Sequence, residues 1–156
     1  MTRRTLGRLA ALVLADLGIV AAWTLAVGAS APRWPAGWLA RDRGPLRLTR
    51  LDAPRHYRRL GVDRWARTLP EWGGVFGLSK RRLPGRTPEA LAGYLVEVRR
   101  AEWVHWLSLA SLVPIARLGP RWLAALFATV ACAVNAPFVA ILRFNRVRLL
   151  RVLARR

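Results

Sequence analysis

Two long apolar stretches dominate the hydrophobic pattern of the chain, at residues 9–27 and 122–142. Each is close to the ~20 residues that an α-helix needs to cross the hydrocarbon core of a bilayer. The sequence between them mixes polar, basic and apolar residues without another run of this length. The pattern therefore predicts an all-α integral membrane protein with one membrane helix near each end.

Residues 1–31 are expected to form an N-terminal signal anchor or signal peptide. Three arginines precede the apolar run, which is longer than the apolar region of a usual signal peptide. Residues 28–31 resemble a small-residue cleavage site, but Pro32 directly after them argues against cleavage and favours an uncleaved anchor helix. Asp16 lies in the middle of the run, so we expect it to face protein, water or an arginine rather than lipid.

Residues 32–86 differ in pattern, since proline, glycine, arginine and tryptophan are mixed there without a long apolar run. Such a composition is typical of short amphipathic segments that lie in the headgroup layer. Residues 69–76, which contain Gly73-Gly74, are predicted to form a turn or loop. We therefore interpret residues 32–86 as a basic interfacial segment whose tryptophans recur at positions Trp34, Trp38, Trp65 and Trp72.

Residues 87–156 are predicted to form a helical hairpin. Its first helix has a clear start at Thr87-Pro88-Glu89, with Thr as the N-cap, Pro at the first helical position and an acid in the first turn. We expect this helix to run to Leu112 or Val113, where Pro114 disturbs it. Its apolar part, residues 103–116, covers only about 21 Å. Because that is too short to span the hydrocarbon, the polar residues before it must be submerged or shielded by neighbouring helices.

The second half of the hairpin follows a turn at residues 117–121, which contains two arginines. Residues 122–142 are predicted to form its helix. Pro137 deprives a carbonyl one turn earlier of its helical donor, and Asn135 is placed to bond such a group or a partner helix. Residues 143–153 are expected to form a basic helix that lies on the membrane surface. The simplest topology has both ends of the hairpin in the cytoplasm.

Composition supports the membrane interpretation. The 156-residue chain forms one unit, is 54% hydrophobic and still carries a formal net charge of +19. All but one of its 27 basic residues are arginines, whose guanidinium groups bind phosphate in a bidentate way. Anionic lipid headgroups explain this charge better than nucleic acid, because the arginines bracket apolar spans and no nucleic-acid motif is present. We expect the protein in the cell membrane.

The most informative segment is residues 97–106, where two carboxylates, two guanidiniums and a histidine directly precede an apolar run. On a helix, Glu102 and His105 share a face. Ionisable groups at membrane depth mark a functional site by default. The alternative is that Trp103 and Trp106 are interfacial anchors and that the charges form ion pairs on a solvated helix end.

Several sequence motifs resemble the glycosyl-4,4'-diaponeurosporenoate acyltransferase family. The resemblance covers residues 65–156 and rests on four patterns in order: Glu97-x-x-Arg100-Ala101-Glu102-x-x-His105-Trp106, Gly119-Pro120-Arg121, Asn135-x-Pro137 and Arg143-x-Asn145-Arg146-x-Arg148. Where the family has Gln, Tyr and Pro in the last region, this chain has Leu142, Phe144 and Val147. The resemblance implies a small membrane enzyme that esterifies a sugar hydroxyl of a glycosylated carotenoid, or a related glycolipid, with a fatty acyl group.

Acyl transfer to a hydroxyl requires a general base and donors that stabilise a tetrahedral oxyanion. We expect His105 to be the base, held in its tautomer by Glu102. Arginines would bind the phosphates of the donor, acyl-CoA or acyl-carrier protein, or the oxyanion. No metal, phosphate-loop or paired-cysteine motif occurs, so no cofactor is expected. The alternative is a non-catalytic membrane scaffold or anionic-lipid-binding protein. The candidate catalytic residues are His105, Glu102, Arg100 and Glu97, and the candidate substrate-binding residues are Arg143, Asn145, Arg146 and Asn135.

Overall fold

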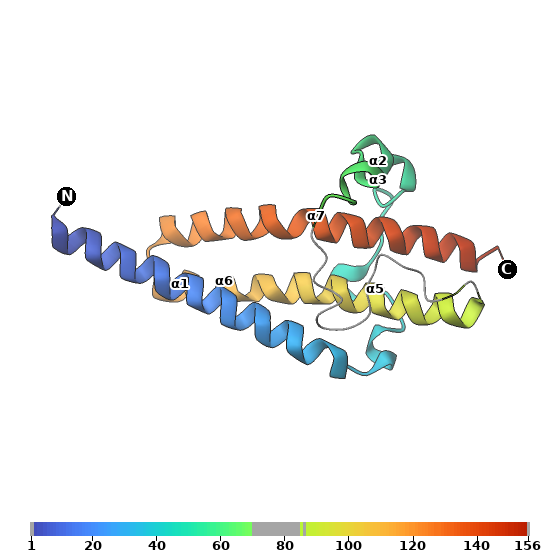
Figure 1. Cartoon of the computed structure of the whole chain (residues 1–156), viewed down its shortest axis with the longest axis horizontal. Helices are drawn as coiled ribbons and strands as arrows, with labels where there is room; N and C mark the ends of the chain where they lie inside the picture. Colours follow the sequence, from blue (N-terminus) through green and yellow to red (C-terminus); the bar gives the residue numbers. More distant parts are fainter. Residues whose placement is uncertain (1, 70–84, 86, 156) are drawn as a thin grey trace.

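The computed structural model describes residues 2–69, 85 and 87–155. Three long helices define it: α1 (Arg3–Ser30), α5 (Pro88–Ser108) and α7 (Arg121–Leu153). Figure 1 shows α5 and α7 side by side and antiparallel, with α1 crossing them obliquely. The described residues contain no strand, so the prediction of an all-α fold is confirmed for them. The predicted turn at residues 69–76 lies, apart from Leu69, outside the described residues.

Helices α1 and α7 are long and apolar enough to cross a membrane. Only 6% of the most apolar 18-residue window of each helix is buried within the protein. A core helix of a soluble protein would bury its apolar residues, whereas these helices expose theirs, as membrane helices do. Asp16 is an exception within α1, because it is only 4% exposed and its carboxylate lies beside Gly119 in the turn before α7. The expectation that Asp16 faces protein is confirmed.

Short helical turns connect α1 to α5. In the described part of this connection they are η1 (Ala31–Arg33), η2 (Ala36–Leu39), η3 (Gly44–Leu46), α2 (Pro54–Arg59) and α3 (Val62–Trp65). The first three pack on α5, and α2 and α3 pack on α7. A small core holds this second contact, since Tyr57 and Val62 are buried against Phe144 of α7. In Figure 1, α2 and α3 stand to one side of α7.

Helix α5 begins as predicted, because Thr87 Oγ1 accepts a hydrogen bond from the amide of Ala90. It ends earlier than predicted, at Ser108, and is followed by η4 (Leu109–Ser111) and α6 (Leu112–Leu118). Proline disrupts the α-helical turn before it for two reasons. It has no N–H to donate, and its ring clashes with the carbonyl four residues earlier. Pro114 therefore fits into the first turn of α6 while the residues before it tighten into a 3₁₀ turn.

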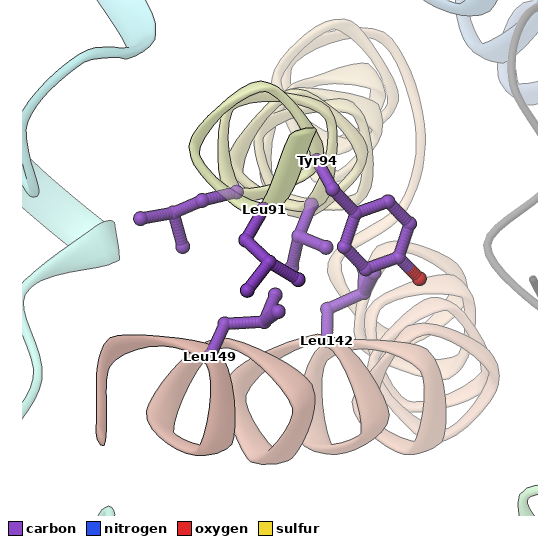
Figure 2. Packing of buried hydrophobic residues seen from close by; sticks show 6 residues of the cluster. Leu91, Tyr94, Leu142 and Leu149 are labelled. Carbon is purple, nitrogen blue, oxygen red and sulfur yellow. The ribbon is translucent and has the colours of Figure 1, made fainter. Parts of the chain in front are cut away.

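The prediction for residues 143–153 was wrong, because they do not form a separate surface helix. Helix α7 continues through Pro137 as one element of 33 residues. Its last turns pack on the first half of α5, where Leu142 and Leu149 meet Leu91 and Tyr94 (Figure 2). These two α7 leucines are seven residues apart and share one helix face, so the basic tail carries an apolar stripe that α5 covers.

Candidate active site

Glu102 lies at the centre of a buried ion-pair network between α5 and α7. Its side chain is fully buried. Arg143 Nε donates to Glu102 Oε1 at 2.9 Å, and Arg146 Nη2 lies 3.1 Å from Oε2. Arg143 and Arg146 are three residues apart and therefore project from the same face of α7. One carboxylate of α5 thus fixes two guanidiniums of α7.

Asp42 extends this network into the connecting segment. Its Oδ1 accepts hydrogen bonds from Arg146 Nη1 at 3.0 Å and from Arg99 Nε at 2.7 Å. Arg99 also donates to the carbonyl of Ala40 at 3.0 Å. The residues just after η2 are therefore tied to both long helices of the hairpin.

Asp52 extends the network on its other side. Arg143 Nη1 lies 3.1 and 3.2 Å from its two carboxylate oxygens. The backbone amide of Thr49 donates at 2.6 Å, and the Tyr57 hydroxyl donates as well. Arg143 Nη2 donates to the carbonyl of Pro45. Every nitrogen of the Arg143 guanidinium is therefore engaged.

These contacts shift two ionisation equilibria. Burial alone would raise the pKa of Asp52, but the hydrogen bonds from Tyr57 and Thr49 and the charge of Arg143 outweigh it, and the net pKa is lowered. Burial raises the pKa of Tyr57, and its hydrogen bond to ionised Asp52 raises it further. Asp52 therefore stays ionised and Tyr57 stays neutral at physiological pH.

The network balances its charges. Three arginines meet three acids, which is the condition under which buried charges are tolerated. Contact is not complete, however, because Arg146 Nη2 and Glu102 Oε2 lack the alignment of a hydrogen bond and Arg146 Nε has no partner among the described residues. The ion-pair network comprises Asp42, Asp52, Arg99, Glu102, Arg143 and Arg146.

His105 forms a separate pair with Asn135. Its Nδ1 lies 2.9 Å from Asn135 Oδ1, and its ring stacks on Phe138 with centroids 5.0 Å apart. The Asn135 amide nitrogen donates to the carbonyl of Ala131 at 2.8 Å, which fixes the orientation of the amide. Since Asn135 Oδ1 can only accept, Nδ1 carries the proton of a neutral His105. Its Nε2 is then the basic nitrogen.

The predicted partnership between Glu102 and His105 was wrong. The hydrogen bonds of Glu102 come from Arg143 and from Trp106 Nε1, the latter at 3.4 Å. In an antiparallel pair, successive turns of α5 meet different turns of α7. Glu102 therefore reaches the turn with Arg143, while His105 reaches the earlier turn with Asn135, which takes over the orienting position.

The remaining predicted site residues, Glu97, Arg100 and Asn145, lie outside the pair of His105 and Asn135. Arg100 Nη1 donates to the carbonyls of Ala31 and Pro32, at 2.9 and 2.8 Å, and its Nη2 lies 3.3 Å from Glu97. It thus fixes the end of α1. Glu97 and Arg100 form an i,i+3 ion pair within α5. Asn145 lies half-buried on α7, between the two network arginines of that helix.

Sequence reasoning missed Asp42, Asp52, Tyr57 and Arg99. The available signal was scarcity, because residues 32–69 contain ten arginines but only three acids. Acids that are rare in so basic a segment are the natural partners of buried arginines elsewhere. Two of those three acids, Asp42 and Asp52, belong to the network.

A groove of about 490 Å³ lies apart from the network, between α1 and the end of the hairpin. Its walls are mostly apolar. The groove is lined by Trp23, Ala110, Val113, Pro114, Arg117 and Leu118.

The described residues contain no group of three or more His, Cys, Asp or Glu side chains that could hold a metal ion.

Comparison with known proteins identifies relatives. The model of the glycosyl-4,4'-diaponeurosporenoate acyltransferase family matches residues 35–155. A protein of that name from Staphylococcus haemolyticus (strain JCSC1435) is 33% identical over 93 residues, which are 56% of this chain and 52% of the relative. One from Staphylococcus aureus (strain USA300) is 32% identical over 80 residues, 49% of this chain and 48% of the relative. The chain thus spans about half the length of these relatives. No solved structure matches.

Proposed function

The chain belongs to the glycosyl-4,4'-diaponeurosporenoate acyltransferase family, and on that basis we propose that it transfers a fatty acyl group to a sugar hydroxyl of a glycosylated carotenoid or related glycolipid. The names of the relatives support the reaction class. The two long apolar helices support a membrane location, which we propose to be the cell membrane. An apolar acceptor would reach the site from the bilayer, and an acyl thioester from the aqueous side.

The single observation that carries this proposal is the pair of His105 and Asn135. The contact with Asn135 favours a proton on Nδ1 and an unprotonated Nε2, which supports His105 as the general base. In the proposed reaction, Nε2 takes the proton from the sugar hydroxyl while the hydroxyl oxygen attacks the acyl carbonyl carbon of the thioester. The tetrahedral oxyanion then collapses, the carbon–sulfur bond breaks, and the departing thiolate takes the proton from the imidazolium. The donor is acyl-CoA or acyl-carrier protein.

The ion-pair network receives a different role in this proposal from the one expected for its arginines. Arg146 is fully buried, and all three nitrogens of Arg143 are engaged. Such groups hold α5, α7 and the connecting segment in register rather than bind a phosphate. Asn145, half-buried beside them, remains the candidate hydrogen-bond donor to substrate.

Helix α1 has a structural role in the proposal as an uncleaved anchor. Trp23 Nε1 donates to the carbonyl of Leu107 at 2.9 Å. Arg100 binds the carbonyls of Ala31 and Pro32. Removal of α1 would leave the carbonyl of Leu107 on the hairpin without its indole donor and would release the segment that Arg100 holds, which supports the retention of α1.

A non-catalytic scaffold is the second candidate function. The observation that favours it is the burial of Glu102 and Arg146, because side chains enclosed in this way contact other parts of the fold rather than a substrate. The two functions differ in the behaviour of His105, which a scaffold does not require as a base.

The test compares the two histidines of the chain. Full-length protein carrying His105→Gln is reconstituted in vesicles with a glycosylated carotenoid and a long-chain acyl-CoA, and the acylated product is measured by mass spectrometry. His56→Gln is the matched control, because His56 bonds the carbonyl of Leu51 away from the proposed site. We expect His105→Gln to lower turnover by at least about 100-fold, the lower end of general-base contributions. Full activity of His105→Gln would exclude His105 as the general base. Inactivity of the wild type with both acyl-CoA and acyl-carrier protein would favour the scaffold.

A further inference from the structure

Helices α2 and α3 form a unit at a defined depth along α7. Val62 and Tyr57 pack against Phe144, and Ala140 and Ile141 of α7 complete the contact. The apolar run of α7 ends at residue 142. From residue 122 to that point the helix rises about 30 Å, which equals the thickness of the hydrocarbon core. When α7 crosses a bilayer, the α2–α3 unit therefore lies beside it at the level of the headgroups.

The surface of this unit suits that level. It exposes basic side chains, and the apolar residues at its borders are exposed as well: Leu51 is 77% and Leu60 is 69% exposed. The one exposed acid among residues 54–68 is Asp63. Guanidiniums beside exposed leucines are typical of segments that lie in the plane of an anionic membrane surface. The exposed arginines of the unit and its following turn are Arg55, Arg58, Arg59, Arg64 and Arg67.

Basic charge is distributed unequally between the two ends of the membrane helices. Residues 33–67, which include the α2–α3 unit, contain ten arginines and pack on one end of the hairpin. Figure 1 shows the N-terminus and the turn between α6 and α7 at the opposite end. These segments contain five arginines, three in the first eight residues and two in residues 117–121. Short segments rich in arginine near membrane helices remain on the cytoplasmic side. The arrangement of the helices therefore supports the orientation in which both ends of the hairpin lie in the cytoplasm.

We propose that the α2–α3 unit lies in the headgroup layer of the cytoplasmic leaflet and binds anionic phospholipid headgroups through its exposed arginines. The guanidinium fork matches a phosphodiester in a bidentate way. An acidic protein partner would fit the charge but not the two exposed leucines at the depth where α7 leaves the hydrocarbon. The membrane is therefore the partner that both features fit.

The first test measures lipid selectivity. Phosphatidylglycerol or phosphatidylcholine is titrated into purified full-length protein in detergent, and retained lipids are counted by native mass spectrometry. The variant carries Arg55→Gln, Arg58→Gln, Arg59→Gln and Arg64→Gln, and the matched control carries the same number of Arg→Gln changes at the opposite end: Arg3→Gln, Arg4→Gln, Arg8→Gln and Arg121→Gln.

We expect the wild type to retain phosphatidylglycerol preferentially and the α2–α3 variant to bind it at least tenfold more weakly, since each arginine near an anionic surface contributes about fivefold. The control should stay within about twofold of that wild-type affinity. Raising the salt to about 1 M, where the Debye length falls to about 3 Å, should weaken retention by the unaltered protein, so the proposal does not depend on the folding of a variant. Equal binding of the two lipids by the wild type, or an equal loss in the control, would overturn it.

The second test measures orientation. In a Cys132→Ala background, single cysteines replace Asp63 on α3 and Thr5 near the start of α1, both of which are exposed. A membrane-impermeant maleimide added to intact cells should label the cysteine at position 5 and should label the one at position 63 only after lysis. The reverse pattern would overturn the cytoplasmic assignment.

Discussion

Glu102→Gln tests whether the ion-pair network carries the stability of the fold. The substitution keeps the size of the side chain but removes the one carboxylate among the described residues that contacts both Arg143 and Arg146. Because the glutamate is fully buried, solvent cannot take its place. Removal of one partner from a buried ion pair costs about 3–5 kcal/mol, since the remaining charge is left without compensation. That is a large part of the about 5–15 kcal/mol that stabilises a typical domain.

The measurement is thermal unfolding of the full-length protein in detergent, followed by helical circular dichroism. For a chain of this size, about 1 kcal/mol changes Tm by about 2–4 °C, so we expect a decrease of roughly 6–20 °C. Asp63→Asn is the control, because this exposed carboxylate should change stability by less than about 0.5 kcal/mol.

A second substitution separates charge from shape. Arg146→Met combined with Glu102→Gln removes one positive and one negative charge and restores the balance of the network. The double variant should therefore be more stable than Glu102→Gln alone. A decrease in Tm of less than 2 °C for the single variant, or a double variant as unstable as the sum of the two single variants, would refute the reasoning.

Three further predictions follow from individual contacts. Asp52 has a lowered pKa in the folded protein, so its stabilising effect is present above its unfolded pKa of 3.8 and is lost as the pH falls through the folded pKa. In urea unfolding, the stability difference between the wild type and Asp52→Asn should therefore shrink from pH 6 to pH 3, and a constant difference would contradict this. Gly61 has φ +67, so Gly61→Ala should destabilise the protein by about 1–2 kcal/mol. Gly93 occupies an exposed position of α5 with open space around it, so Gly93→Ala should stabilise the protein by about 0.5–1 kcal/mol; effects of equal sign in urea unfolding would exclude backbone strain as the cause. Asn135→Ala should lower kcat by about tenfold or more with little effect on KM, because His105 loses its orienting partner; a change in KM alone would assign Asn135 to substrate binding.

The sequence predicted the elements that depend on local or periodic signals. The apolar runs located α1 and α7, and the N-cap Thr87 located the start of α5 at Pro88. The i,i+3 rule was less reliable for charges. It paired Glu102 with His105, whereas Glu102 binds Arg143, 41 residues later. Arg99, on the same helix, likewise binds a distant residue, Asp42, 57 residues earlier. Exposed i,i+3 pairs contribute only a few tenths of a kcal/mol, so packing between helices decides the partners of a buried charge.

The same comparison explains why the end of α7 was assigned to the membrane surface. Its arginines dominate the composition of residues 143–153, but the face with Leu142 and Leu149 is covered by α5. Arg146, on that buried side, is neutralised by Glu102 and Asp42 instead of by lipid. Charge alone therefore could not distinguish arginines that bind carboxylates within the fold from arginines that face headgroups.

Arg143 connects the features that the proposals treat separately. It binds Glu102 on α5 and Asp52 in the connecting segment, and Asp52 accepts a hydrogen bond from the hydroxyl of Tyr57 on α2. The α2–α3 unit is therefore joined through two carboxylates to the turn of α5 that precedes His105. If lipid headgroups hold this unit in place, the position of His105 relative to the membrane surface follows from the same contacts. An enzyme that joins an apolar acceptor to a water-soluble donor requires its base at a fixed depth, and this chain of ion pairs supplies a physical means of setting that depth.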